Sequence, residues 1–233
     1  MTSRNRQWRL GRLGRSRLYL CTDSRGSLDD FAAFVEAAYA GGVDIIQLRD
    51  KHIDALSELR FLSVLRDAAL RHDALFAVND RADIAAVSDA DIVHVGQDDL
   101  PVAETRQVVG REVLIGRSTH SVDQAREARL ADTDYYCIGP VWATPTKQGR
   151  PGVGVDAVRA VAQQADDKPW FGIGGVNAQN LAQVTDAGAT RIVVVRALTG
   201  ADDPAAAARE LLARLYGGNK TVSNDEAFKL RYQ

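Results

Sequence analysis

The sequence predicts an α/β protein with a single domain, a (β/α)8 TIM barrel. Short apolar runs, rich in Val, Ile, Leu and aromatic residues, alternate with amphipathic helical segments along the chain. Each run is closed by glycine, a polar residue or a turn signal, which is typical of parallel strands buried on both faces. Eight such runs within 233 residues match the usual size of an eight-stranded barrel.

The predicted strands follow one another at regular intervals. They are RLYLCT, VDIIQLR, LFAVN, DIVHVG, VLIGRS, DYYCIG, WFGIGG and RIVVVRA. A doubly wound open sheet is the rival arrangement, and it would place a glycine-rich phosphate turn after its first strand. Here the first strand is followed by CTDSRGS, which is not such a turn, so the barrel is favoured.

The helical segments between the strands have recognisable ends. SLDDFAAFVEAAYAGG has Ser27 as its N-cap, acidic residues in its first turn and a stop at Gly41–Gly42. NAQNLAQVTDAG is expected to begin after a cap at Asn177 and to stop at Gly188. In DDPAAAARELLARLYGG, Pro204 suits the first helical turn.

Both ends of the chain are expected to lie outside the barrel, which occupies residues 17–216. Residues 1–16 form a basic extension without a periodic pattern, and residues 217–233 form a polar tail. Terminal segments without apolar anchors are commonly mobile, and we expect mobility at both ends.

Composition narrows the class of protein. The chain is 45% hydrophobic and 26% charged, as in an ordinary soluble globular protein. Its net charge of −2 provides no general attraction to nucleic acid or membranes, and no apolar run reaches the length of about 18 residues that spans a bilayer. Cys21 and Cys137 lie inside predicted strands as small buried hydrophobes, which favours the reducing cytoplasm.

The active site of such a barrel forms at the carboxyl ends of the strands. The second strand ends in QLRDK, which places Gln47, Arg49 and Lys51 at alternate positions and therefore on one face. The two cations suit a polyanion, and the amide suits a ring that both donates and accepts hydrogen bonds. A strand end with solvated charges is the alternative interpretation.

Carboxylates follow the next two strands. The third strand ends in Asn79 and Asp80, and the fourth runs into HVGQDD with Asp98 and Asp99. Two carboxylates that meet across the barrel mouth, with phosphate oxygens and water, would make a site for Mg2+. A turn at ND and a helix cap at DD are the alternative.

The other strand ends also suit anions. After the fifth strand, Ser118 could donate a hydrogen bond to an anion, and His120 could act as a base or orient a loop. His94 is expected to be a core residue with its hydrogen bonds satisfied. The loops after the last two strands, with Gly175 and Val195–Arg196, would present backbone N–H groups to a phosphate.

The segment GPVWATPTKQGRPGVG after the sixth strand is rich in glycine and hydroxyl groups. It matches neither GxxxxGK[ST] nor GxGxxG, although Thr144, Thr146 and Lys147 suit phosphate oxygens. Together the strand ends predict two anion sites in one mouth, one for a polyphosphate with a metal and one for a monophosphate. A pyrophosphate leaving group opposite a phosphorylated acceptor is the simplest chemistry that needs both.

The motifs QLRDK, ND, HVGQDD, GRSTHS, GPVWATPTK and GIGGV, in this order, resemble the thiamine-phosphate synthase family. The resemblance runs from about Arg17 to Tyr216. It implies a transferase that joins a hydroxymethylpyrimidine diphosphate to a hydroxyethylthiazole phosphate and releases pyrophosphate. It implies Mg2+ as cofactor and small-molecule substrates, with no nucleic acid or membrane partner. A homo-oligomer is compatible with it.

The resemblance also implies roles for individual residues. The pyrimidine diphosphate would be bound by Gln47, Arg49, Lys51, Asn79, Ser118 and Lys147, and Mg2+ by Asp80 and Asp99. The thiazole phosphate would be bound by Thr144, Thr146, Gly175, Val195 and Arg196. Catalysis would rest on Arg49, Lys51, Ser118 and Lys147, with KQGRPGVG as a lid. The family often has Ser where this chain has Arg196. If backbone N–H groups hold the phosphate, the site is retained, and Arg196 adds a charge contact. If the Ser hydroxyl is essential, this chain lacks it and binds the thiazole phosphate less tightly.

The resemblance implies a dissociative displacement, which needs charge neutralisation for pyrophosphate but no protein nucleophile. A thiazole tautomerase of the same barrel family is an alternative, with His120 as its proton-transfer residue. It has no use for the diphosphate cluster. Another phosphate-binding barrel, such as an epimerase or an indole-pathway enzyme, and a non-catalytic protein that binds thiamine precursors are further alternatives.

Overall fold

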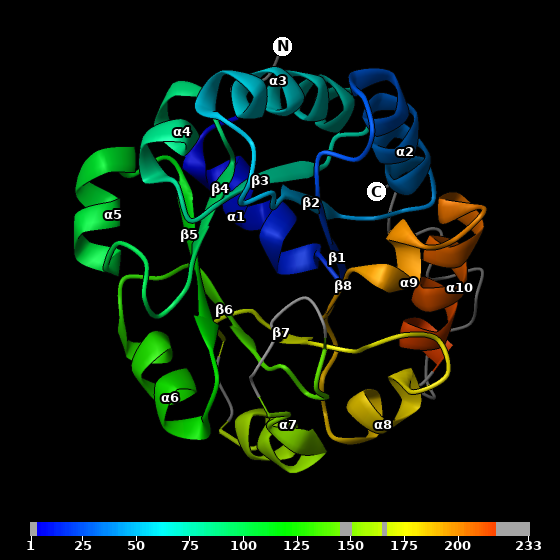
Figure 1. Cartoon of the computed structure of the whole chain (residues 1–233). Coiled ribbons are helices and arrows are strands. Elements are labelled where there is room, and N and C mark those ends of the chain that lie inside the picture. Colours follow the sequence, from blue (N-terminus) through cyan, green and yellow to red (C-terminus); the bar gives the residue numbers. More distant parts are fainter. Residues whose placement is uncertain (1–3, 145–150, 165–166, 218–233) are drawn as a thin grey trace.

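The protein is an eight-stranded parallel barrel surrounded by helices (Figure 1). The computed structural model describes residues 4–144, 151–164 and 167–217. Strands pair in chain order, and β8 pairs back with β1 to close the barrel. The strands are β1 (Leu18–Thr22), β2 (Ile45–Leu48), β3 (Leu75–Asn79), β4 (Ile92–Val95), β5 (Leu114–Thr119), β6 (Tyr135–Ile138), β7 (Trp170–Ile173) and β8 (Ile192–Val194). All eight predicted strands are confirmed.

The helices follow the strands around the outside. They are α1 (Arg6–Arg15), α2 (Leu28–Ala40), α3 (Ala55–Arg71), α4 (Ala82–Val87), α5 (Val102–Val109), α6 (Val122–Leu130), α7 (Gly154–Ala162), α8 (Leu181–Asp186), α9 (Arg196–Thr199) and α10 (Pro204–Gly217). The predicted starts of two of them are confirmed: the Ser27 side chain caps α2 by accepting a hydrogen bond from the Asp30 N–H at 3.2 Å, and Pro204 is the first residue of α10.

One predicted helix start was wrong. Helix α8 begins at Leu181 rather than just after Asn177. The side chain of Asn177 accepts hydrogen bonds from the backbone N–H groups of Gln179 and Asn180 within a turn, at 2.9 and 3.2 Å. The amide of Asn180 in turn donates to the Gly175 carbonyl at 2.9 Å. These side chains order the loop after β7, and the helix starts only when the turn is complete.

Alternate strand residues fill the barrel interior, and the others pack against the surrounding helices. Tyr135 and Phe171 are fully buried inside the barrel, whereas Leu20 and Ile46 face the helices. Gly116 of β5 makes this interior possible, because a Cβ at that position would lie 2.1 Å from the ring of Tyr135. The ring therefore leans across the backbone of the neighbouring strand.

An aspartate stands just before each of three even-numbered strands. Each accepts a hydrogen bond from a backbone N–H group at the start of the preceding odd-numbered strand. The pairs are Asp44 with Leu18 at 3.0 Å, Asp91 with Phe76 at 3.2 Å and Asp134 with Ile115 at 2.8 Å. Before β8 the same place is occupied by Arg191, so the acidic series stops there.

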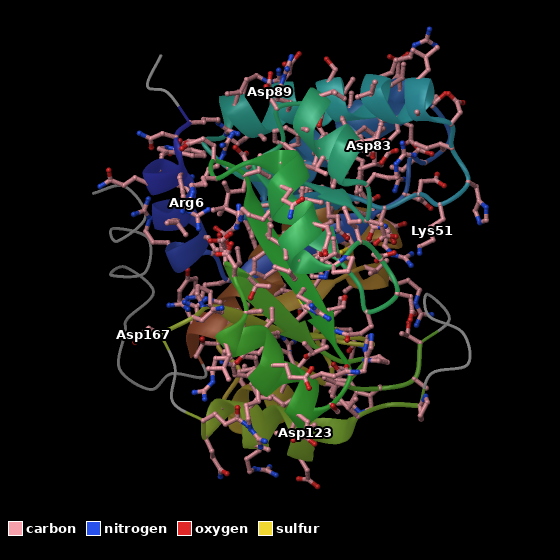
Figure 2. The ribbon with its side chains drawn as sticks, turned by 90° about the vertical axis from the view of Figure 1, so that its left-hand side faces the viewer. Arg6, Lys51, Asp83, Asp89, Asp123 and Asp167 are labelled. Carbon is pink, nitrogen blue, oxygen red and sulfur yellow. The ribbon has the colours of Figure 1, made fainter. Side chains whose placement is uncertain are left out.

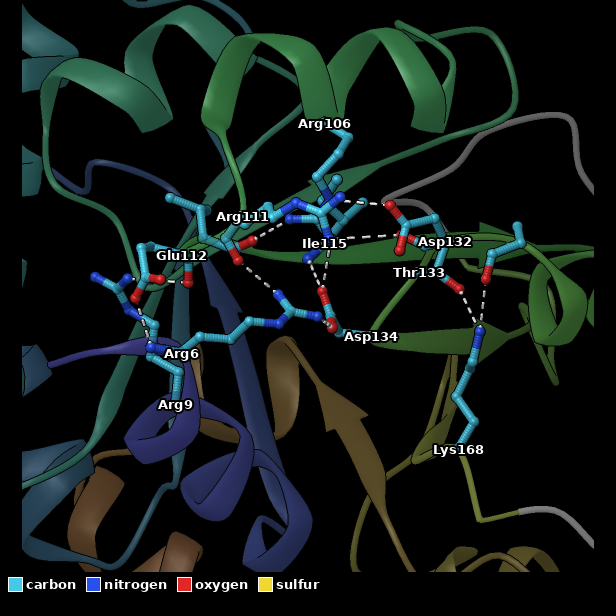
Figure 3. A network of polar contacts seen from close by, with 12 residues as sticks. Arg6, Arg9, Arg106, Arg111, Glu112, Ile115, Asp132, Thr133, Asp134 and Lys168 are labelled. Atoms are coloured by element: carbon cyan, nitrogen blue, oxygen red, sulfur yellow. Dashed lines mark hydrogen bonds and ion pairs between the residues drawn. The ribbon is translucent and has the colours of Figure 1, made fainter.

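The expectation that residues 1–16 are mobile and unpatterned was wrong for residues 6–15. Helix α1 lies across the amino ends of the strands and is seen through the centre of the barrel in Figure 1. Leu13 is fully buried and packs into the barrel interior. Arg9 pairs with Asp91 at 3.0 Å. Arg6 pairs with Asp134 and donates to the Arg111 carbonyl at 2.9 Å (Figure 3).

Two further expectations have different outcomes. Cys21 and Cys137 are buried, as predicted, and neither forms a disulfide. The polar tail lies outside the described residues from position 218 onward. Among the helices that the structure describes, none has both the length and the apolar character required to cross a membrane.

Candidate active site

A cavity of about 500 Å3 opens at the carboxyl ends of the strands. Predicted site residues from β2, β3, β5 and the loops after β6, β7 and β8 line it together. These residues are Gln47, Arg49, Asn79, Ser118, Thr144, Gly175, Val195 and Arg196. The cavity therefore gathers side chains that lie far apart in the sequence.

Gln47 and Arg49 bring two different kinds of chemistry to one wall. Gln47 is almost completely buried, its Nε2 donates to the Tyr19 hydroxyl at 2.9 Å, and its Oε1 accepts from the Cys21 thiol at 3.2 Å. Both ends of the amide are thus held in place. The Arg49 guanidinium lines the cavity and forms no hydrogen bond or ion pair with any residue in the described part of the chain. It is available to an anion.

Lys51, Asp80 and Asp99 form a cluster beside the cavity. The Lys51 ammonium lies 3.0 Å from the Asp80 carboxylate. Asp80 adopts a left-handed backbone conformation with φ of 61°, which Asp tolerates better than most residues. Burial raises the pKa of Asp99, and the hydrogen bond with Asp80 and the repulsion of its charge raise this pKa further. The two carboxyl groups therefore meet across the barrel mouth.

This pair of carboxyl groups suits a divalent cation. Bringing two carboxylates together disfavours their ionised forms, and a cation between them removes the repulsion. The described residues contain no group of three or more His, Cys, Asp or Glu side chains that could hold a metal. Two carboxylates fit Mg2+, which takes few protein ligands and completes its shell with water and substrate phosphate.

Ser118 and His94 lie in the wall below the cluster. The Oγ of Ser118 and Nε2 of His94 are 2.9 Å apart, and Nδ1 of His94 lies 2.9 Å from the Tyr135 hydroxyl. His94 is buried with both ring nitrogens in hydrogen bonds, as predicted, yet it also lines the cavity. His120 lines the cavity too, with Nδ1 placed 2.5 Å from the Gly139 carbonyl oxygen.

The opposite wall is built from backbone. The loops after β6 and β7 are joined by hydrogen bonds from the Val141 N–H to the Ile173 carbonyl at 2.8 Å and from the Trp142 N–H to the Gly174 carbonyl at 3.1 Å. Gly175 has φ of 73°, and a Cβ there would lie 3.0 Å from Cβ of Trp142. Glycine is required at this position for both its conformation and its close approach to the neighbouring loop.

Arg196 follows β8 at the mouth of the same cavity. Its side chain is exposed, and it makes no hydrogen bond or ion pair with the described residues. Thr144 lines the cavity nearby. Thr146 and Lys147 fall outside the described residues, as does the first half of the expected lid, residues 147–150.

Comparisons with known proteins agree on one family. The family model described as thiamine monophosphate synthase matches residues 18–198. A thiamine-phosphate synthase of Thermobifida fusca is 58% identical over 205 residues, which cover 88% of this chain and 94% of the relative. One of Mycolicibacterium vanbaalenii is 55% identical over 213 residues, which cover 88% of this chain and 96% of the relative.

The chain belongs to the thiamine-phosphate synthase family. A solved structure, thiamine phosphate pyrophosphorylase from Pyrococcus furiosus, has the same fold, with a TM-score of 0.80 and 30% identity. That similarity covers 89% of this chain and 98% of the other. The predicted family and fold are therefore confirmed.

The predicted site and the observed cavity of this thiamine-phosphate synthase family member differ in a few residues. Lys51, Asp80 and Asp99 lie outside the lining of the cavity, among the residues that the structure describes. Tyr19 and Tyr135 were not predicted as site residues, although their hydroxyls, 3.1 Å apart, connect Gln47 to His94. Their periodicity marks them only as interior strand residues, so nothing in the sequence distinguishes them from packing residues.

Proposed function

We propose that this protein joins a hydroxymethylpyrimidine diphosphate to a hydroxyethylthiazole phosphate, producing thiamine phosphate and pyrophosphate. The observation that carries the proposal is one cavity lined by two guanidinium groups, Arg49 and Arg196, neither of which has a carboxylate partner within the described residues. Two cations without carboxylate partners among the described residues, one after β2 and one after β8, suit two phosphorylated substrates. The relatives are named for thiamine phosphate, the product of this reaction.

The pyrimidine diphosphate is assigned to the wall formed by β2, β3 and β5. Gln47 presents an amide to the ring, while Arg49 and Asn79 donate to the diphosphate. Ser118 adds a hydroxyl, and Lys51 adds a cation next to Asp80. Lys147 completes this set on the strength of the family resemblance alone.

The thiazole phosphate is assigned to the opposite wall. Backbone N–H groups at Gly175 and Val195 and the hydroxyls of Thr144 and Thr146 would bind its oxygens. Arg196 stands where the family often has Ser, and its exposed guanidinium supplies a charge contact in place of a hydroxyl.

Mg2+ is the proposed cofactor. Asp80 and Asp99 would hold it, because these carboxyl groups already lie together. When bound, the ion neutralises charge that develops on the departing pyrophosphate.

The reaction needs electrostatics and positioning from this chain rather than acid–base chemistry. The carbon–oxygen bond to the diphosphate breaks, and its electron pair leaves with pyrophosphate, where Arg49, Lys51 and Ser118 stabilise the charge. The lone pair of the thiazole nitrogen then forms the new carbon–nitrogen bond. Neither step requires the protein to move a proton or to supply a nucleophile.

The decisive experiment measures pyrophosphate release by the purified protein with both substrates, first with Mg2+ and then with EDTA. Metal-dependent release that yields thiamine phosphate supports the proposal, and omission of either substrate is the control. No release, with isomerisation of a thiazole carboxylate phosphate instead, would indicate a tautomerase that uses His120. Neither activity would indicate a binding protein.

We further propose that the enzyme works in the cytoplasm on these two small molecules. Neither nucleic acid nor membrane is part of the proposal. Size-exclusion chromatography with and without substrates would determine whether it forms a homo-oligomer.

A further inference from the structure

An unbroken chain of buried hydrogen bonds crosses the barrel interior below the cavity. It links Gln47 of β2 to Ser118 of β5, and both residues belong to the wall assigned to the pyrimidine diphosphate. The contacts are Gln47 Nε2 to Tyr19 OH at 2.9 Å, Tyr19 OH to Tyr135 OH at 3.1 Å, Tyr135 OH to His94 Nδ1 at 2.9 Å and His94 Nε2 to Ser118 Oγ at 2.9 Å. All five side chains are buried.

The direction of donation along this chain follows from its first member. An amide nitrogen only donates, so the oxygen of Tyr19 accepts from Gln47 and the Tyr19 proton is free to go to Tyr135. The Tyr135 proton then goes to Nδ1 of His94. A neutral histidine that accepts at Nδ1 carries its proton on Nε2, and this proton goes to the Ser118 oxygen.

This direction decides what Ser118 can do. With its oxygen accepting from His94, the hydroxyl proton of Ser118 remains available to an anion in the cavity. In the opposite direction His94 would donate from Nδ1 to Tyr135, and its Nε2 would accept the Ser118 proton. Ser118 would then have no proton to give to a diphosphate.

We propose that Tyr135 is a positioning residue that holds His94 in the Nε2–H tautomer and so directs the Ser118 hydroxyl proton into the cavity. The identity of the anion rests on the proposed function, whereas the direction of the hydrogen bonds does not.

One contact sets the direction of these hydrogen bonds, and two further features preserve them. The Cys21 thiol lies 3.2 Å from Oε1 of Gln47, which favours the orientation that turns the amide nitrogen toward Tyr19. Burial raises the pKa of both Tyr19 and Tyr135, so both hydroxyls keep their protons. Gly116 lies on β5 beside His94 of β4 and Tyr135 of β6, and its lack of a side chain leaves room for the Tyr135 ring.

The first test needs no core variant. A long-range proton–nitrogen correlation spectrum of the substrate-free protein, with isotope-labelled histidine, reports the tautomer of each of the four histidines. Single substitutions His52→Gln, His72→Gln and His120→Gln assign the His94 signal by elimination. A proton on Nε2 alone is expected. A proton on Nδ1, alone or in addition, overturns the proposal, whether or not the protein proves to be a synthase.

The second test compares two matched hydroxyl deletions. Tyr135→Phe should lower kcat about tenfold, because the Ser118 hydroxyl then donates its proton to His94. In a Ser118→Ala background the same substitution should lower kcat further by less than about twofold. Tyr19→Phe should leave the His94 tautomer unchanged, because the Tyr135 hydroxyl still donates to Nδ1 of His94. It should raise KM for the pyrimidine diphosphate, because Gln47 loses a partner, and this effect should multiply with that of Ser118→Ala. The proposal would be overturned if the loss of kcat in the double variant Tyr135→Phe/Ser118→Ala equalled the product of the losses in the two single variants.

Discussion

The two ends of this barrel carry many charged side chains but arrange them in opposite ways. Figure 2 shows Arg6 at the amino end and Lys51 at the carboxyl end. At the amino end, Asp91 lies between Arg4 and Arg9, and Asp134 lies between Arg6 and Arg106. At the carboxyl end, Arg49 and Arg196 lack carboxylate partners in the described chain, and Asp99 lies against another carboxyl group, Asp80.

The difference shows how one fold separates stability from function. A buried charge is costly unless it is paired and hydrogen-bonded, and Asp91 and Asp134 at the amino end meet both conditions. Unpaired cations and adjacent carboxyl groups lower stability, so they are expected where a ligand supplies the missing charge. The physical chemistry of the charges thus identifies the working end, in agreement with the general position of active sites in such barrels.

The largest effect should come from the carboxyl end. Asp80→Ala or Asp99→Ala should lower Mg2+-dependent turnover about a thousandfold, because the metal loses one of its two protein ligands. Circular dichroism should show an intact fold. Asp83→Ala is the control, since this neighbour is exposed and pairs with Arg81. Near wild-type turnover in both variants would remove the metal assignment.

At the amino end, Asp91→Ala should act on stability instead. Asp91 is fully buried against Arg4 and Arg9, so its loss should lower the free energy of unfolding by about 3 kcal/mol and leave kcat of the folded enzyme unchanged. Urea denaturation measures the first quantity. Asp132→Ala is the control, because Asp132 is an exposed partner of Arg106. This substitution should lower the free energy of unfolding by less than about 1 kcal/mol. A large loss of kcat would contradict the separation of the two ends.

Arg196→Ser restores the residue that the family often has at the mouth of the cavity. We expect KM for the thiazole phosphate to change by no more than about tenfold, with kcat unchanged, because Arg196 is exposed and its charge is screened. The salt dependence of KM should become weaker. An unchanged salt dependence would show that Arg196 does not contact the acceptor phosphate.

The smallest expected effect is on the pH dependence of stability, and it comes from Asp99 at the carboxyl end. Asp99 has a raised pKa in the folded protein, so the wild type loses stability as the pH rises through that pKa. Asp99→Asn cannot ionise. In EDTA, the variant and the wild type should therefore unfold at about the same temperature at acidic pH. At neutral pH the variant should unfold at the higher temperature, with a gain in the free energy of unfolding of less than about 1 kcal/mol. A variant that is less stable at neutral pH would rule out carboxyl repulsion.

Much of the fold could be predicted because buried parallel strands leave continuous apolar runs in the sequence. Helix α1 was missed because its ten residues include four arginines and few apolar anchors. Its partners Asp91 and Asp134 lie more than eighty residues away, at 82 positions from Arg9 and 128 from Arg6. No local pattern reports a helix stabilised by such distant charges.

The site divides in the same way. Gln47, Arg49, Asn79 and Ser118 could be predicted as neighbours, because parallel strands in a barrel end at one face. The contact between Tyr19 and Tyr135 could not, because the two strands are not adjacent in the barrel and the contact depends on the space that Gly116 leaves.

By itself, the sequence determined the eight strands, the family and the strand ends that carry polar chemistry, since strand burial and chain order are local properties. Only the tertiary structure decided which of the charges are paired, where α1 packs and how Gln47 is linked to Ser118. Those features depend on distances between residues brought together by closure of the barrel, and the linear chain does not encode them in any local pattern.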